Sequence, residues 1–216
     1  SKYIQLNKFL LKTIASDLEN INDGLFLKKF IEYLAEEEKE KPVYDINKKI
    51  LRAAHFLATK WEYELIKNYN KTGYQNDEIR EDFIKKEQSF STLESMKELN
   101  FSHNLKKFMN LCGELRYQIR WNQLYRIPKT SVLGHQLIVA IITYFLSLEN
   151  NFCTKRIYNN FFTGLFHDLP EVMTRDIISP LKSNVEGLDD FIKDLEHEEM
   201  KKIYDLVFPE IKQDLK

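Results

Sequence analysis

The sequence predicts an all-α fold, and three observations support this prediction. Apolar residues recur at steps of three and four along nearly the whole chain, which is the period of a helix. No stretch alternates apolar and polar residues between hairpin turn signals. The 216 residues include only 6 glycines and 5 prolines, too few for a turn-rich β-sandwich.

The N-terminal part of the chain predicts three amphipathic helices in succession. The first carries the apolar stripe Tyr3, Leu6, Leu10, Ile14 and Leu18. The second follows two good N-cap residues, Asn22 and Asp23, and ends before Pro42; its stripe is Phe26, Leu27, Phe30, Ile31 and Leu34. The third is capped by Asp45, and its predicted buried stripe is Ile46, Ile50, Ala54, Leu57, Trp61 and Leu65.

The middle and the C-terminal half of the chain give further signals of helix ends. The polar residues 68–75 include Gly73 and predict a loop, and Ser-Thr-Leu-Glu at 91–94 has the form of a capping box that opens another helix. Helices are predicted at 131–149, 154–167 and 188–207, the last ending before Pro209. Within the first of these, one stripe is predicted to face the core: His135, Val139, Ile142 and Leu146.

Composition and charge exclude several classes of function. Lys and Arg total 32 against 33 for Asp and Glu, so a nucleic-acid partner is not expected. The two cysteines, Cys112 and Cys153, are too few for a disulfide framework or a four-cysteine zinc site, which favours a reducing, cytoplasmic location. No apolar run approaches the roughly 20 residues that span a bilayer, and no secretory signal is visible, so no membrane partner is expected.

Two of the five histidines stand in positions that suggest a metal site. His167 is followed directly by Asp168 at the end of a predicted helix, so both could place a donor atom on one cation. The small Gly164 on the same face leaves room for an ion, or for a close contact between two helices. His135 is either a core histidine hydrogen-bonded to a backbone carbonyl or a ligand directed toward the His-Asp pair.

The residues around these histidines form a longer pattern, made of Arg120-Trp121, the segment from Thr130 to His135, and two further segments, 166–176 and 179–182. This pattern resembles the HD-domain phosphohydrolase superfamily. Within the superfamily, the chain is most similar to the bacterial 5'-deoxynucleotidase-like group, which has an Arg-Trp pair fifteen residues before its first metal-binding histidine, as here. The resemblance covers residues 116 to about 210.

The resemblance implies a fold and a domain organisation. The fold would be an HD-domain helical bundle with additional N-terminal helices. Residues 1–110 would form an N-terminal helical region and residues 111–216 the metal-binding core, together one compact unit, with further C-terminal helices of the family expected beyond the last residue.

The resemblance also implies a role for each candidate site residue. The metal ligands would be His135, His167 and Asp168, and Glu171 and Asp176 would act as acid, base or water-positioning carboxylates. Arg120 and Trp121 would hold the phosphate and the nucleoside of the substrate. Lys182 would lie near the entrance of the same site. The structural alternative for Arg120 is an ion pair with a helix acid such as Glu114 or Glu171.

The expected cofactor is one divalent transition metal ion: Mn, Co, Fe, Ni or Zn. Binuclear members of the family add histidines after the His-Asp pair, whereas only His197 follows here, which favours one metal. The family takes a fourth ligand from a later helix. In this protein the fourth ligand would come from beyond Lys216, or from His55.

The resulting prediction is hydrolysis of the phosphate monoester of a (deoxy)nucleoside monophosphate by a metal-activated water. The expected partner is therefore a small-molecule phosphate, and a homodimer is one expected assembly. Two alternatives remain open. One is an HD-fold module that binds nucleotide or metal and serves a protein partner with little or no turnover, and the other is a purely structural helical protein. The exact substrate depends on pocket shape, which a sequence does not give.

Overall fold

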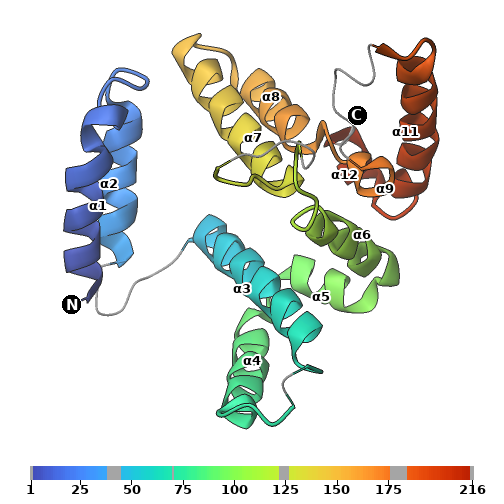
Figure 1. Cartoon of the computed structure of the whole chain (residues 1–216). Coiled ribbons are helices and arrows are strands. Elements are labelled where there is room, and N and C mark those ends of the chain that lie inside the picture. Colours follow the sequence, from blue (N-terminus) through green and yellow to red (C-terminus); the bar gives the residue numbers. More distant parts are fainter. Residues whose placement is uncertain (1, 38–44, 70, 122–126, 176–183, 215–216) are drawn as a thin grey trace. The chain divides into compact units, whose positions relative to one another are not determined.

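A computed structural model describes residues 2–37, 45–69, 71–121, 127–175 and 184–214, and the prediction of an all-α fold is confirmed (Figure 1). Among these residues there is no strand, and Ile119 and Ser131 form one isolated antiparallel bridge. The helices are α1 (Lys2–Leu18), α2 (Leu25–Glu37), α3 (Ile46–Ile66), α4 (Asn76–Phe90), α5 (Glu94–Phe101), α6 (His103–Glu114), α7 (Val132–Glu149), α8 (Thr154–Phe166), α9 (Glu171–Thr174), α11 (Leu188–Tyr204) and α12 (Pro209–Asp214).

The chain divides into two compact units, each of which is described by itself. The first comprises Ser1–Leu10 and Ile31–Ser102, and the second comprises Leu11–Phe30 and His103–Lys216. The division into residues 1–110 and 111–216 stays a prediction.

In the first unit, α3 and α4 enclose an aromatic core. Ala53, Phe56, Leu93 and Met96 are buried there, with Leu57, Phe83 and Phe90 packed against them. The predicted cap of α3 is confirmed, because the Asp45 carboxylate accepts a hydrogen bond from the Lys48 backbone N–H at 2.8 Å. The loop predicted at 68–75 fits the turns between α3 and α4.

Two local predictions in this unit are wrong. The buried residues of α3 are Ala53 and Phe56, whereas Ile46 and Ile50 of the predicted stripe are exposed. This helix carries apolar residues on more than one face, and the aromatic rings of α4 select the face that is buried. The second error is the capping box: α5 follows Leu93 without a side-chain cap, because the Ser91 hydroxyl donates to the Gln88 carbonyl at the end of α4.

In the second unit, α7 and α8 form an antiparallel pair that approaches closely through small side chains (Figure 1). A Cβ atom placed on Gly164 would lie 3.2 Å from the Ala140 Cα, tighter than ordinary van der Waals contact. Further along the pair, the Asn160 side-chain amide donates to the Ser147 hydroxyl at 3.0 Å. The close helix contact that the sequence offered as one interpretation of Gly164 is therefore present.

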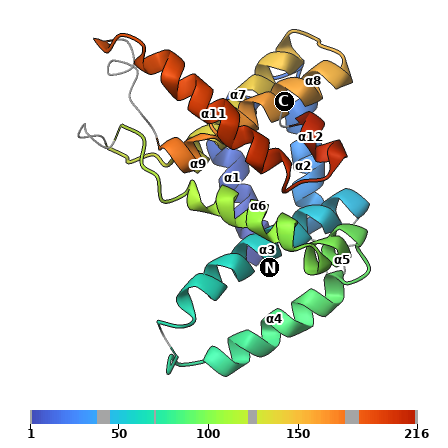
Figure 2. The same ribbon diagram turned by 90° about the vertical axis from the view of Figure 1, so that its right-hand side faces the viewer.

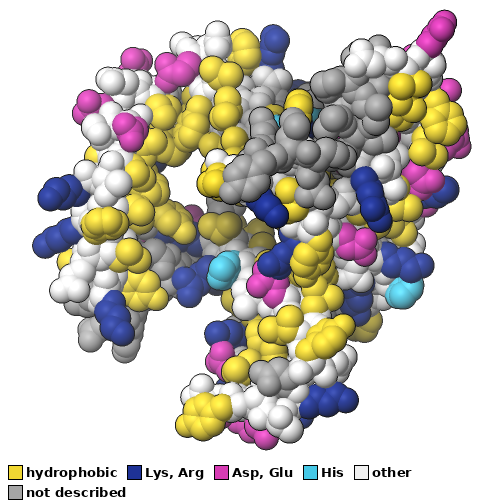
Figure 3. Space-filling view, in the orientation of Figure 1, with side chains coloured by type: hydrophobic (Ala, Val, Ile, Leu, Met, Phe, Trp, Pro, Cys, Tyr) yellow, Lys and Arg dark blue, Asp and Glu magenta, His cyan; other side chains and the backbone are white. Residues whose placement is uncertain are grey.

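The predicted core stripe of α7 is wrong. The buried residues of this helix are Val132, Gln136, Ala140 and Ser147, whereas Ile142 and Leu146 are 52% and 58% exposed. The reason is the close approach of α8, which admits small residues and directs the large aliphatic side chains away. Apolar side chains accordingly reach the molecular surface (Figure 3).

The same helix is the one described helix that is long and apolar enough to cross a membrane. Val132–Glu149 has 18 residues with a mean hydropathy of 1.6. This finding rests on length and composition alone. Core helices of soluble proteins pass the same test, so the finding does not assign a membrane-spanning role to α7.

A second hydrophobic core joins the start of α7 to α6, α9, α11 and α12. Its buried residues are Leu115, Val132, Leu169, Val172, Ile203 and Val207. Figure 2 shows α9 beside α6 and α11, in agreement with their contacts. This core holds the first turn of α7 and the turn after α8 together, and the predicted metal ligands His135, His167 and Asp168 lie in those two turns.

The close approach at Gly164 gives a first prediction. Gly164→Ala is expected to lower the free energy of unfolding, because overpacking costs about 1–3 kcal/mol, which exceeds or offsets the ~1 kcal/mol gain in helix propensity. The Ala140 backbone is the contacted group, and a backbone yields less readily than a side-chain end. Denaturant unfolding measures the effect. Thr163→Ala, an exposed neighbour, is the control, and a Gly164→Ala protein as stable as the parent would contradict the prediction.

The two free cysteines give a second prediction. Burial raises the pKa of the Cys112 thiol to about 11, whereas Cys153 is exposed. Because the thiolate is the reactive form, Cys112 stays protonated at pH 8, and reactivity at this position should rise only as the pH approaches 11. A thiol reagent at pH 8 should therefore label one cysteine per folded chain and both after unfolding. Cys153→Ser should abolish labelling of the folded chain; two reactive thiols before unfolding would refute the assignment.

Candidate metal centre

Three predicted ligands from two segments of the second unit come together. Donor atoms of His135, His167 and Asp168 all lie within 4.8 Å of one another. The Asp168 Oδ2 atom is 3.1 Å from His167 Nε2 and 3.6 Å from His135 Nε2. The two imidazole rings stand at 65° with their centroids 5.3 Å apart. Among the described residues this is the one group of at least three His, Cys, Asp or Glu side chains with such spacing.

The end of α8 fixes the orientation of His167. This residue is the C-cap of the helix, and its Nδ1 atom lies 2.9 Å from the Gly164 carbonyl oxygen. A carbonyl oxygen can only accept, so Nδ1 carries the hydrogen, and in the neutral ring Nε2 then presents its lone pair. A backbone carbonyl on the far nitrogen is the usual support of a metal-binding histidine. Gly164 therefore serves twice, as the close helix contact and as the acceptor.

The start of α7 positions His135. Ser131 is the N-cap, and its hydroxyl accepts a hydrogen bond from the Gly134 N–H at 3.1 Å. The His135 backbone N–H donates to the Ser131 carbonyl at 2.9 Å, so the histidine stands in the first turn of the helix. Its side chain is 28% exposed. Half-burial fits a ligand that faces a cation at the protein surface better than a core histidine.

A short segment before α7 brings Arg120 to the same place. The Arg120 N–H donates to the Thr130 carbonyl at 2.9 Å, and the Val132 N–H donates to the Gln118 carbonyl at 2.9 Å. The Arg120 Nη1 atom then lies 2.5 Å from Asp168 Oδ2. Arg120 is thus paired with a candidate metal ligand, rather than with Glu114 or Glu171, the partners that its structural alternative proposed.

Trp121, the next residue, is half-buried and has a φ angle of 55°. Left-handed backbone costs a bulky residue about 1–3 kcal/mol, and such residues cluster at active sites and ligand clamps. The assignment of Trp121 to the substrate stays a prediction.

Glu171 stands one turn after Asp168. Its N–H donates to the Asp168 carbonyl at 3.1 Å, it begins α9, and the residue is 9% exposed. The Gln118 side-chain amide donates to the Val172 carbonyl at 3.1 Å, which ties the Arg120 segment to this helix. Sequence reasoning missed Gln118, and an amide side chain before the Arg-Trp pair gives no signal of this role.

The remaining candidates do not belong to the described cluster. Asp176 and Lys182 lie outside the described residues. His55 is exposed on α3, in the first unit. His103 and His197 are exposed at the start of α6 and on α11.

The donor set suits a transition metal. Two imidazole nitrogens and one carboxylate oxygen are ligands that Mn, Fe, Co, Ni and Zn accept and that Ca and Mg rarely choose. The His167 tautomer and the short distances from Asp168 fit this interpretation. Three donors of the described residues are thus spaced so that they could hold a metal ion.

Comparison with known proteins agrees with this geometry. A family model described as an HD domain matches residues 112–216, a range that contains the whole cluster. Neither curated proteins nor solved structures give a match to the chain. The family match supports an assignment of this region to the HD-domain superfamily. Members of that superfamily bind divalent metals and are generally hydrolases.

Proposed function

We propose, from the premise that residues 112–216 carry an HD domain, that the chain is a one-metal phosphohydrolase acting on a (deoxy)nucleoside monophosphate. The observation that carries the proposal is the meeting of His135, His167 and Asp168 beside the guanidinium of Arg120. A cation site next to a phosphate-binding group is what hydrolysis of a phosphate monoester requires.

In this proposal the chain supplies the ligands and holds them in place. A divalent ion, when bound, supplies Lewis acidity and a water whose pKa is lowered toward neutrality. His135 and His167 hold it through Nε2 and Asp168 through its carboxylate. The hydrogen bond from His167 Nδ1 to Gly164 keeps that imidazole in the required orientation and tautomer.

Arg120 is the proposed phosphate anchor. Its guanidinium presents a planar fork of N–H groups that matches two phosphate oxygens. The pair with Asp168 already holds Nη1 beside the cation site, and the Arg120 side chain is 20% exposed. A substrate phosphate arriving there would exchange one carboxylate contact for phosphate contacts, with no long movement of the side chain.

The leaving alkoxide needs a proton, and Glu171 and Asp176 are its proposed sources. Glu171 is sheltered from bulk water and stands one turn from Asp168, which suits proton transfer at its carboxyl group. The roles of Asp176, of Lys182 near the mouth and of Trp121 against the nucleoside rest on the family resemblance. The homodimer, the cytoplasmic location, and the lack of nucleic-acid or membrane partners also stay predictions.

Phosphate release tests the proposal. The chain, loaded with Mn, Co, Fe, Ni or Zn in turn, is incubated with a panel of ribo- and deoxynucleoside monophosphates. Release from at least one of them, lost on chelation and restored by metal, is the expected result.

The presence of three rather than four protein donors among the described residues favours one alternative, a binding module. Nucleotide binding without phosphate release by the metal-loaded chain would support that module instead.

A further inference from the structure

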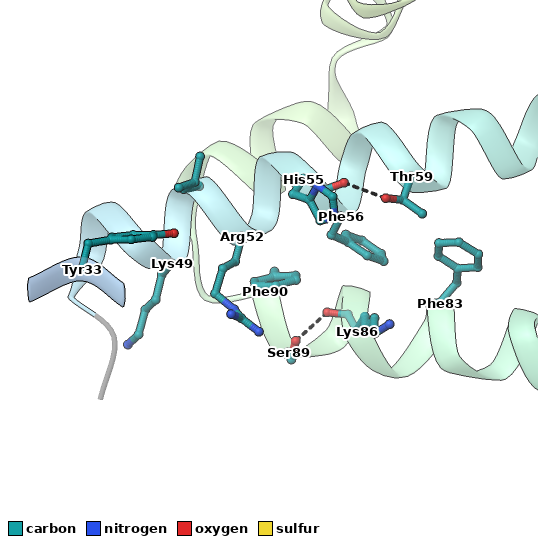
Figure 4. A pocket seen from close by; sticks show the side chains of 11 residues that line it. Tyr33, Lys49, Arg52, His55, Phe56, Thr59, Phe83, Lys86, Ser89 and Phe90 are labelled. Carbon is teal, nitrogen blue, oxygen red and sulfur yellow. Dashed lines mark hydrogen bonds between the residues drawn. The ribbon is translucent and has the colours of Figure 1, made fainter. Parts of the chain in front are cut away.

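The first unit contains a cavity that the proposed hydrolase function does not use. It has a volume of about 910 Å³ and lies between α3 and α4, with Tyr33 of α2 at one end (Figure 4). Cavities that bind small organic ligands usually enclose ~300–1,000 Å³, so its size suits one such molecule.

Facing stripes of the two helices line this cavity with cations and aromatic rings. On α3 the stripe is Lys49, Arg52 and Phe56, at steps of three and four residues. On α4 it is Phe83, Lys86 and Phe90, again at steps of three and four. Such steps place side chains on one face of a helix. In Figure 4 the three phenylalanine rings lie between the helices, and Arg52 extends from α3 toward α4.

The aromatic rings form an apolar floor. The Phe56 ring centroid is 5.6 Å from that of Phe90 and 5.9 Å from that of Phe83, and both pairs are tilted. Phe56 is 5% exposed, whereas the other two rings are half-buried and reach the cavity. A planar apolar ligand would gain from contact with such rings.

The charge at the cavity is one-sided. None of the described residues that line it is acidic, whereas Lys49, Arg52 and Lys86 are basic. The nearby Glu87 carboxylate is engaged by Lys60 at 2.7 Å, and Asp82 meets Lys86 at 2.7 Å in a well-exposed pair. Exposed pairs of this kind contribute about 0–1 kcal/mol, so a ligand anion can take over the Lys86 contact at little cost.

Such a lining suits an anion, and a small one. Elsewhere on α4, acidic residues alternate with basic ones, as Asp77 with Arg80 and Glu81 with Lys85. Acidic and basic side chains are also mixed on the surface drawn in Figure 3. A long polyanion would meet these carboxylates, whereas a molecule confined to the cavity would meet lining residues among which none is acidic.

We propose that this cavity is a second ligand site, separate from the metal centre, for a small organic phosphate that carries an aromatic ring, the chemistry of a nucleotide. The ring lies against Phe56, Phe83 and Phe90, and the phosphates contact Arg52 and Lys86, with Lys49 adding to the positive charge. The proposal does not depend on hydrolysis at His135, His167 and Asp168.

Calorimetric titration with ATP in EDTA tests it, on the full chain and on His167→Ala, which disables the metal centre. Both proteins should bind one ATP with the same affinity. Lys86→Ala and Arg52→Ala should each weaken binding about tenfold, the usual effect of losing one charge-assisted contact. Lys85→Ala is the matched control: it removes the neighbouring lysine of α4, which also pairs with an acid four residues earlier but does not line the cavity. It should change the affinity less than twofold.

Adenosine and inorganic tripolyphosphate serve as the two halves of the ligand, and each should bind at least tenfold more weakly than ATP. Tripolyphosphate binding as tightly as ATP would overturn the proposal, because the aromatic floor would then contribute nothing. Loss of ATP binding in His167→Ala, equal losses in Lys86→Ala and Lys85→Ala, or no binding by the parent chain would also overturn it. Phosphate release by metal-loaded Lys86→Ala, assayed in parallel, reports separately on the hydrolase function.

Discussion

Replacing His167 with alanine is expected to abolish stoichiometric metal binding. The substitution removes one of three described donors. It leaves His135 Nε2 and Asp168 Oδ2, 3.6 Å apart, as the two remaining donors. Affinity for Mn or Co should fall on the order of 100-fold or more, since even outer contacts of a metal ligand contribute 10–100-fold. Competition with a chromogenic chelator measures the affinity, and elemental analysis of the purified protein measures the content.

Stability should change far less than metal affinity in this variant. The His167 side chain is 32% exposed and makes one hydrogen bond to a backbone carbonyl, which contributes about 0.5–1.5 kcal/mol. His197→Ala is the matched control, because that histidine is also exposed and helical but lies outside the cluster. A His167→Ala protein that keeps the metal content of the parent would refute the site.

Replacing Arg120 with alanine is expected to lower kcat/KM about 100-fold while leaving bound metal in place. That loss corresponds to ~2.7 kcal/mol, the range of a charge-assisted contact to a phosphate at a partly buried site. Metal affinity should stay the same or rise, because the guanidinium that pairs with the Asp168 carboxylate is gone. Arg120→Lys should recover only part of the activity, because an ammonium group cannot reproduce the planar fork.

The alternative role of Arg120 predicts a different combination of results. If its pair with Asp168 chiefly holds the fold together, Arg120→Ala should lower the melting temperature, the metal content and the turnover together. Arg116→Ala is the control, since this arginine stands in the same segment and lies over the Tyr117 ring. Phosphate release, metal content and thermal unfolding measured on the same preparations distinguish the two roles.

The starts of several helices could be predicted from the sequence, because helix signals are local. Asp45 caps α3 and Ser131 caps α7 through bonds to residues three positions away, so a short window of sequence contains both partners. The capping box predicted at 91–94 is wrong, and the cause is again local. The Ser91 hydroxyl donates a hydrogen bond to the Gln88 carbonyl at the end of α4, so it does not cap α5.

The buried face of each helix could not be predicted from periodicity alone. On α7 the large residues Ile142 and Leu146 formed a convincing stripe, yet Ala140 and Ser147 are the residues that face α8. The choice depends on how closely the partner helix approaches, and that approach is set by Gly164 on a different helix.

The sequence by itself determined that the chain is helical, and it named three candidate ligands for the metal centre: His135, His167 and Asp168. His167 and Asp168 are adjacent, so their shared position at a helix end follows from the chain. Only the tertiary structure decided that His135, 32 residues earlier in the sequence, meets them, and that Arg120 pairs with Asp168. Such long-range distances depend on how α7 packs against α8 and on how the Arg120 segment is held beside them. This packing depends on the shapes of both contacting surfaces, which come from parts of the chain far apart in sequence.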